Sequence, residues 1–182
     1  MAKVMKRAAV LCASAALLFI LLCIFNSSDL WLTPAVTAAT FAYHLVMRLA
    51  VGGVYDRLLH NRVNYRRRWF CPRFFEADLY RLLRVKEWKD HLPTYDPKTF
   101  STQLHSWEEI AQATCQSELV HETIMVLSFV PVLAINHFGS AGVFWATSAI
   151  SACFDSLFVI TQRYNRFRLI KIIDRQTARR TK

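Results

Sequence analysis

Several patterns that mark well-known protein classes are missing from this chain of 182 residues. Its five cysteines show no metal-ligand spacing, and four lie within or beside apolar segments, so neither a metal site nor a disulfide framework is predicted. A Gly-x-Ser-x-Gly stretch and a Cys–His pair in a recognisable context are both missing, which argues against a covalent serine or cysteine nucleophile. Glycine and proline are scarce, with 4 and 5 residues, whereas hydrophobic residues make up 54% of the chain.

The apolar residues come in blocks rather than in periodic stripes, and the mean hydropathy is +0.21. The first block, Ala8 to Phe25, has no charge and follows Lys3, Lys6 and Arg7. It is longer than a usual signal-peptide core and no small-x-small cleavage site follows it, so we interpret it as a retained membrane anchor. Each block reaches the ~17–25 residues that cross ~30 Å of hydrocarbon. Four spans are predicted, at about 8–25, 31–54, 119–135 and 141–160.

The basic residues predict an orientation for these spans. There are 3 before the first block, 11 in the segment 56–118 and 8 in the tail 162–182, but none in the turns 26–30 and 136–140. The positive-inside rule therefore places both termini and the central segment in the cytoplasm. We expect a single multi-pass domain, 1–182, in the plasma membrane. Lys and Arg beside anionic lipids also explain the net charge of +10, so no nucleic-acid partner is expected.

The central segment is rich in aromatic and leucine residues, particularly in the stretch Trp69 to Trp88. Its apolar residues fall at helical spacing, which predicts an amphipathic helix lying in the membrane interface. Further on, Ser106 and Glu109 fit a capping box, and the helix that they open is expected to continue into the third span. The fold class is thus all-α integral membrane, with an interfacial helix between the second and third spans.

Three polar residues at the start of the third span suggest chemistry. Glu118, His121 and Glu122 are spaced i, i+3 and i+4, which puts them on neighbouring positions of one helical surface. A carboxylate beside an imidazole can orient the ring as a general base. The alternative is an interfacial polar collar without chemistry. A di-iron site needs a second Glu-x-x-His and two more carboxylates, so no metal is expected.

Ionisable residues also occur inside two of the predicted spans. His44 and Arg48 lie at i, i+4 in the second span, and Asp155 lies in the fourth. Such residues usually face the bundle interior or a polar pathway. Arg48 has the alternative of extending to the cytoplasmic surface. Asp155 has the alternative of an interhelical pair with His44 or Arg48.

Three short motifs carry a resemblance to a known family. The stretches "RVKEWKDHLP" (84–93), "SELVHE" (117–122) and "QRYNRFR" (162–168), in this order around such spans, resemble the glycosyl-4,4'-diaponeurosporenoate acyltransferases. The similarity covers about residues 31–169. The family usually has proline after Asn-Arg, where this chain has Phe167.

The resemblance implies transfer of a fatty acyl group to a sugar hydroxyl of a lipid-embedded acceptor, and the departure at Phe167 leaves open whether this acceptor is the family's namesake carotenoid. Acyl transfer needs a general base, a hydrogen-bond donor to the oxyanion and cationic side chains that bind the thioester donor. These groups are expected where spans three and four meet the cytoplasm. The expected catalytic residues are His121, Glu118, Asn165 and Tyr164. The expected substrate-binding residues are Arg163, Arg166, Lys89, Asp90, Trp88, Glu76, His44 and Asp155.

No bound cofactor is expected, and acyl-CoA or a similar thioester is the expected co-substrate. The expected partners are membrane lipids, the acceptor and the acyl donor. Two alternatives stay open: a methyltransferase-like group transfer to a membrane lipid, and a non-catalytic membrane subunit that binds a partner through its aromatic cytoplasmic helix.

Overall fold

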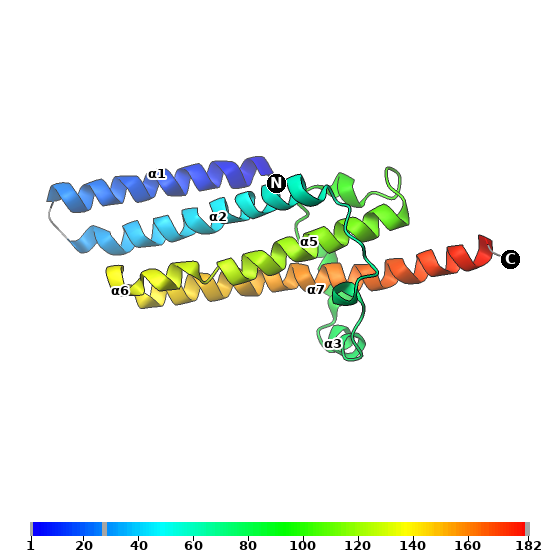
Figure 1. The fold of residues 1–182 in the computed structure, drawn as a ribbon. Helices are drawn as coiled ribbons and strands as arrows, with labels where there is room; N and C mark the ends of the chain where they lie inside the picture. The colour runs from blue at the N-terminus through cyan, green and yellow to red at the C-terminus, as the bar shows by residue number, and fades with distance from the viewer. Residues whose placement is uncertain (1, 27–28, 181–182) are drawn as a thin grey trace. The chain divides into compact units, whose positions relative to one another are not determined.

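The computed structural model describes residues 2–26 and 29–180, which form helices and connecting turns without a strand. Four helices in this part of the chain are long and apolar enough to cross a membrane (Figure 1). Three of them are α1 (Ala2–Asn26), α2 (Leu32–Leu59) and α7 (Ala141–Arg180). The fourth starts with α5 (Trp107–Leu127) and continues to Phe138. The predicted all-α membrane class is confirmed. Ser27 and Ser28 of the first predicted turn, and Lys182 of the basic tail, lie outside the described residues.

The third span changes its helical form near Pro131. Helix α5 ends at Leu127 and is followed by the 3₁₀ helix η5 (Val130–Ala134) and by α6 (Ile135–Phe138). Because proline has no backbone N–H, the carbonyl of Leu127 loses the helical donor four residues further on. The Tyr43 hydroxyl replaces it, donating to that carbonyl at 2.8 Å. The chain then reverses at Gly139, whose φ of 63° is a left-handed conformation that glycine adopts without strain.

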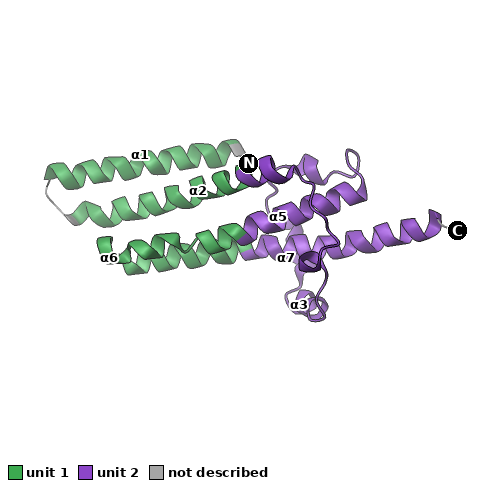
Figure 2. Cartoon of the chain, viewed as in Figure 1, with its two compact units in different colours: residues 1–53, 123–155 green, residues 54–122, 156–182 purple. Residues whose placement is uncertain are grey.

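The chain divides into two compact units (Figure 2). Unit 1 comprises residues 1–53 and 123–155, and unit 2 comprises residues 54–122 and 156–182. Helices α2, α5 and α7 contribute residues to both units.

Unit 1 holds an ion pair between two of its long helices. The Arg48 guanidinium on α2 pairs with the Asp155 carboxylate on α7 and donates to the Ser151 hydroxyl at 2.8 Å. The interhelical pair weighed for Asp155 is therefore confirmed, with Arg48 as its partner. The alternative in which Arg48 extends to the cytoplasmic surface is wrong, because its guanidinium is held by the neighbouring helix.

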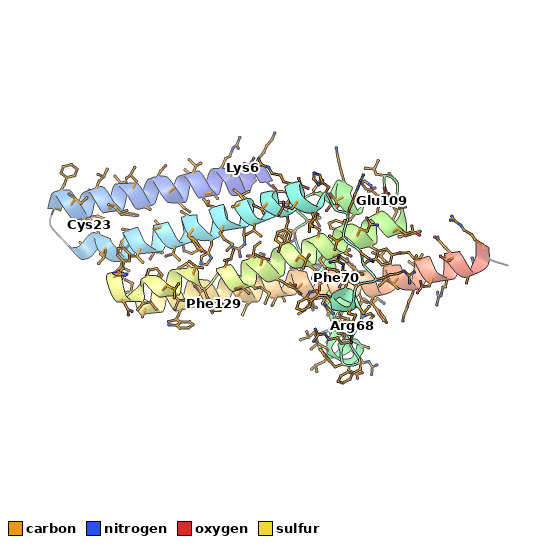
Figure 3. The ribbon with its side chains drawn as sticks, viewed as in Figure 1. Lys6, Cys23, Arg68, Phe70, Glu109 and Phe129 are labelled. Carbon is orange, nitrogen blue, oxygen red and sulfur yellow. The ribbon has the colours of Figure 1, made fainter. Side chains whose placement is uncertain are left out.

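Two apolar clusters of unit 2 include residues from the first half of α5. In the first, Ile110 and Ala111 pack against Leu169 and Ile173 of α7. In the second, Cys115 packs with Val63 and Phe70, and Phe70 is labelled in Figure 3. Helix α5 therefore contributes buried residues to both clusters.

The segment between α2 and α5 is helical in short pieces. It contains η2 (Arg68–Phe70), α3 (Glu76–Leu82), α4 (Val85–Trp88), η3 (Lys89–His91) and η4 (Pro97–Phe100). One continuous helix over 69–88 is therefore not observed. Pro72 lacks the N–H that a helix interior requires, and Arg84 adopts a left-handed φ of 49° that separates α3 from α4.

The start of α5 follows the predicted capping box. The Ser106 hydroxyl accepts a hydrogen bond from the Glu109 backbone N–H at 3.3 Å, and the Ser106 N–H donates to the Glu109 carboxylate at 2.8 Å. These reciprocal bonds satisfy donors that a helix start leaves unpaired. The prediction that Ser106 and Glu109 open the third long helix is confirmed.

Candidate functional site

The two arginines of the "QRYNR" motif lie within a buried charge network of unit 2. Arg163 and Arg166 are three residues apart on α7, so they share one face of the helix. Both reach Glu118 on α5: the Arg163 Nη1 lies 2.5 Å from its Oε1, and Arg166 Nη2 pairs with its Oε2. Glu118 is 0% exposed and Arg166 is 1% exposed.

A second carboxylate completes the network. Glu76, at the start of α3, accepts from Arg163 Nη2 at 2.5 Å and from Arg163 Nε at 3.0 Å. Two carboxylates and two guanidiniums thus balance one another out of water. Buried charges are tolerated when each is paired with a charge of the opposite sign in this way.

The network also anchors the backbone that leads into α3. Arg163 donates to the carbonyl of Trp69 at 3.2 Å and to that of Cys71 at 3.4 Å. Arg166 donates to the carbonyl of Phe70 at 3.3 Å, and its guanidinium lies 5.0 Å from the centre of the Phe70 ring. The motif arginines therefore fasten the segment 69–71 to helix α7.

Helix α3 turns its polar side toward this network. Glu76 and Tyr80 lie one turn apart, and the Tyr80 hydroxyl donates to Glu76 Oε2 at 2.8 Å. Burial raises the pKa of Tyr80, and its hydrogen bond to the Glu76 carboxylate raises the pKa further. The Tyr80 ring meets that of Tyr164 edge to face, with centroids 5.4 Å apart.

Large apolar side chains at the two ends of this helix are exposed. Phe74, just before α3, is 95% exposed and Leu82, at its end, is 80% exposed. Around them stand basic side chains, which include the exposed Arg73, Arg81 and Arg84. This arrangement fits a surface that meets lipid.

His121, the expected base, lies half-buried on α5. Its ring is stacked on that of Phe158 of α7, with centroids 4.5 Å apart and an angle of 7° between the planes. Glu122, the next residue, accepts a hydrogen bond from the Trp69 indole at 3.1 Å. Since both oxygens of Glu118 are held by arginines, the pairing of Glu118 with His121 stays a prediction.

The remaining expected residues occupy three other places. Lys89 pairs with its neighbour Asp90 at 2.5 Å, and this ammonium lowers the pKa of Asp90. The Trp88 indole donates to the carbonyl of Leu83 at 2.8 Å, and Asn165 is half-buried on α7. His44 and Asp155 belong to unit 1.

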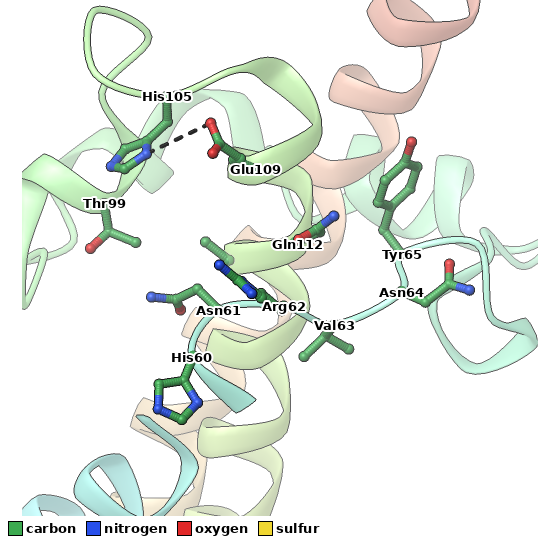
Figure 4. A pocket seen from close by; sticks show the side chains of 11 residues that line it. His60, Asn61, Arg62, Val63, Asn64, Tyr65, Thr99, His105, Glu109 and Gln112 are labelled. Atoms are coloured by element: carbon green, nitrogen blue, oxygen red, sulfur yellow. Dashed lines mark ion pairs between the residues drawn. The ribbon is translucent and has the colours of Figure 1, made fainter. Parts of the chain in front are cut away.

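An open pocket of about 680 Å³ lies in unit 2 (Figure 4). Polar residues from the segment that follows α2 and from the start of α5 line it, among them His60, Arg62 and Gln112. His105 faces Glu109 across 3.9 Å at its edge. His60 and Asn61 adopt positive φ at the end of α2. The sequence carries no motif that would have predicted this pocket. Among the described residues, no group of three or more His, Cys, Asp or Glu could hold a metal ion.

Residues 66–175 match the family model for glycosyl-4,4'-diaponeurosporenoate acyltransferase. The matched range contains the whole network, from Trp69 and Glu76 through Glu118 to Arg166. The curated proteins and the solved structures gave no match.

Proposed function

The chain belongs to the glycosyl-4,4'-diaponeurosporenoate acyltransferase family, and from this premise we propose that it moves a fatty acyl group from a cytoplasmic thioester to a hydroxyl of a lipid-embedded glycosylated carotenoid. Acyl transfer itself follows from the family. The donor, the cytoplasmic side and the membrane-held acceptor are parts of the proposal. The observation that carries it is the family match over residues 66–175, which include both motifs around His121 and Arg163.

His121 is the proposed general base. Its imidazole accepts the proton of the acceptor hydroxyl while the hydroxyl oxygen bonds to the thioester carbonyl carbon. When the carbon–sulfur bond breaks, the leaving thiolate takes that proton from the imidazolium, so an ester and a free thiol are formed. Tyr164 and Asn165, both half-buried on α7, are the proposed donors to the oxyanion. The stack on Phe158 restricts the orientation of the His121 ring.

We assign Arg163 and Arg166 a positioning role instead of a grip on the donor's phosphates. Their guanidiniums already face Glu76 and Glu118, so a phosphate would have to displace a carboxylate from each. We assign binding of the donor phosphates to exposed basic residues of unit 2, such as Arg68 and Arg73. Arg68 is labelled in Figure 3.

The proposed setting is the plasma membrane, with both termini in the cytoplasm. This orientation rests on the basic residues of the segment 56–118 and of the tail, which anionic lipid head groups attract. The proposed partners are membrane lipids, the acceptor and an acyl-CoA-like donor, without a bound cofactor or a nucleic acid.

The test is acyl transfer by the purified protein in lipid nanodiscs, supplied with a fatty acyl-CoA and a glucosylated carotenoid. Ester formation is followed by mass spectrometry and free thiol by colorimetry. His121→Ala should lower kcat by about 100-fold, because positioned base catalysis typically contributes about that much. The control is His137→Ala, an exposed position on α6. Near-normal turnover of His121→Ala would mean that the polar residues of "SELVHE" form an interfacial collar without a catalytic role. A product that forms without the thioester would overturn the proposed reaction.

A further inference from the structure

Unit 1 contains buried polar side chains other than those assigned to the acyl-transfer step. Helix α2 carries Thr40, His44 and Arg48 at spacings of four residues, so they follow one face of the helix. Helix α7 carries Ser148, Ser151 and Asp155 at spacings of three and four residues, which also share one face. Polar residues inside membrane-spanning helices are rare and usually serve a function.

Most of these polar groups satisfy one another. Arg48 pairs with Asp155 and donates to Ser151, and the Ser151 hydroxyl lies 2.7 Å from that of Ser128 on the continuation of α5. The Thr40 hydroxyl donates to the carbonyl of Val36 at 2.7 Å. The one positive and the one negative charge of this group therefore compensate each other.

Two buried side chains on these helix faces have no hydrogen-bond partner for their polar atoms among the described residues. They are His44, through both ring nitrogens, and Ser148, through its hydroxyl. His44 is 5% exposed and Ser148 is 0% exposed. A neutral imidazole has one donor and one acceptor nitrogen, and a hydroxyl can do both. Leaving such groups unpaired away from water is unfavourable, so they point to a binding partner that both donates and accepts.

We propose that His44 and Ser148 form a binding site in unit 1 for a neutral, hydroxyl-bearing group carried on an apolar molecule. An anion is disfavoured because the only guanidinium of this polar group, that of Arg48, is committed to Asp155. A hydroxyl gives and accepts a hydrogen bond, which is what the His44 ring and the Ser148 hydroxyl require together. The inference rests on the proposed function in one respect: the sugar hydroxyls of the lipid acceptor supply this chemistry.

The test measures binding without turnover. A carotenoid quenches tryptophan fluorescence, and unit 1 holds Trp31 and Trp145. The full chain in nanodiscs is titrated with a glucosyl ester of a carotenoid acid and, separately, with the methyl ester of the same acid. His44→Phe and Ser148→Ala should each weaken binding of the glucosyl ester about 10-fold, the usual effect of one lost hydrogen bond in a buried site, and leave the methyl ester unchanged. His44→Gln, which keeps a donor and an acceptor, should restore part of the affinity.

Thr147→Val is the matched control, because its hydroxyl on the same helix already donates to the carbonyl of Val143 at 2.7 Å. It should bind both ligands as the wild type does. Equal loss for both esters would mean that His44 only supports the packing, and unchanged binding in His44→Phe and Ser148→Ala would mean that water satisfies these groups; either result overturns the proposal. No thioester is added, so the titration tests binding alone. His44-dependent binding of the glucosyl ester, together with no ester product when acyl-CoA is supplied in the nanodisc assay, would refute the proposed reaction and leave the binding site intact.

Discussion

Replacing Glu118 by glutamine tests the buried charge network most directly. The change removes the negative charge that Arg163 and Arg166 share but keeps a side chain of the same shape. Arg166, 1% exposed, would remain charged because a guanidinium is not deprotonated in proteins. Removing one partner of a buried ion pair typically lowers the free energy of unfolding by about 3–5 kcal/mol. Since the glutamine oxygen still accepts a hydrogen bond, we expect a loss near the lower value.

The assay is unfolding of the purified protein in mixed micelles by added sodium dodecyl sulfate, followed by circular dichroism. Glu122→Gln is the matched control, because Glu122 lies four residues away on the same helix and accepts from the neutral indole of Trp69. Its loss should stay near 1 kcal/mol, the usual net value of one hydrogen bond. In Glu118→Gln the segment 69–76 should also become cleavable by protease, because its backbone is tied to Arg163 and Arg166.

A compensating pair separates the charge effect from the effect of shape. Glu118→Leu combined with Arg166→Met removes one charge of each sign, and it leaves Arg163 paired with Glu76. This double variant should be more stable than either single variant, because neither charge is left alone. If Glu118→Gln unfolds like Glu122→Gln, or the double variant is no better than its parents, the network does not hold the unit together as argued.

Three further outcomes are expected. A reporter fused after Gly139 should lie outside and one fused after Pro97 in the cytoplasm, since the turn before Gly139 has no basic residue; the opposite signals would invert the proposed topology. Phe74→Ser with Leu82→Ser should lower kcat/KM about tenfold or more for a membrane-embedded acceptor and little for a short soluble one, whereas equal losses would show no lipid contact. Tyr80 stays protonated in the folded protein above the ordinary pKa of 10.0, so its contribution to stability is intact below pH 10 and falls as the pH rises further. Tyr80→Phe should remove that part of the decline between pH 9 and pH 11 in unfolding titrations, and an unchanged decline would refute the role of Tyr80.

The sequence predicted well those features that are local in the chain. Apolar blocks of sufficient length define the long helices, because a span is a property of about twenty consecutive residues. The Ser106 to Glu109 capping box involves residues three apart, and it formed as expected. The sequence also indicated the pair of Arg48 with Asp155, because an ionisable residue in an apolar helix needs a partner and the other predicted spans offer few.

The partners of the motif arginines were not predictable in this way. Arg163 and Glu76 are 87 positions apart, and nothing in the spacing of either residue points to the other. From the sequence alone, a dense basic motif at a helix end is equally consistent with a bound phosphate and with a buried carboxylate. Only the folded chain decides between them, by placing Glu76 and Glu118 against the same guanidinium.

The orientation of α3 follows from this network. In a helix on the surface of a water-soluble domain, Phe74 and Leu82 would be expected to point inward and Glu76 and Tyr80 outward. Here the inner surface carries Arg163, so the carboxylate of Glu76 has its partner on the inside. The apolar residues are left on the outer surface, where water would disfavour them and lipid would not. The same arginine that fixes the segment thus determines which side of α3 is free to meet the membrane.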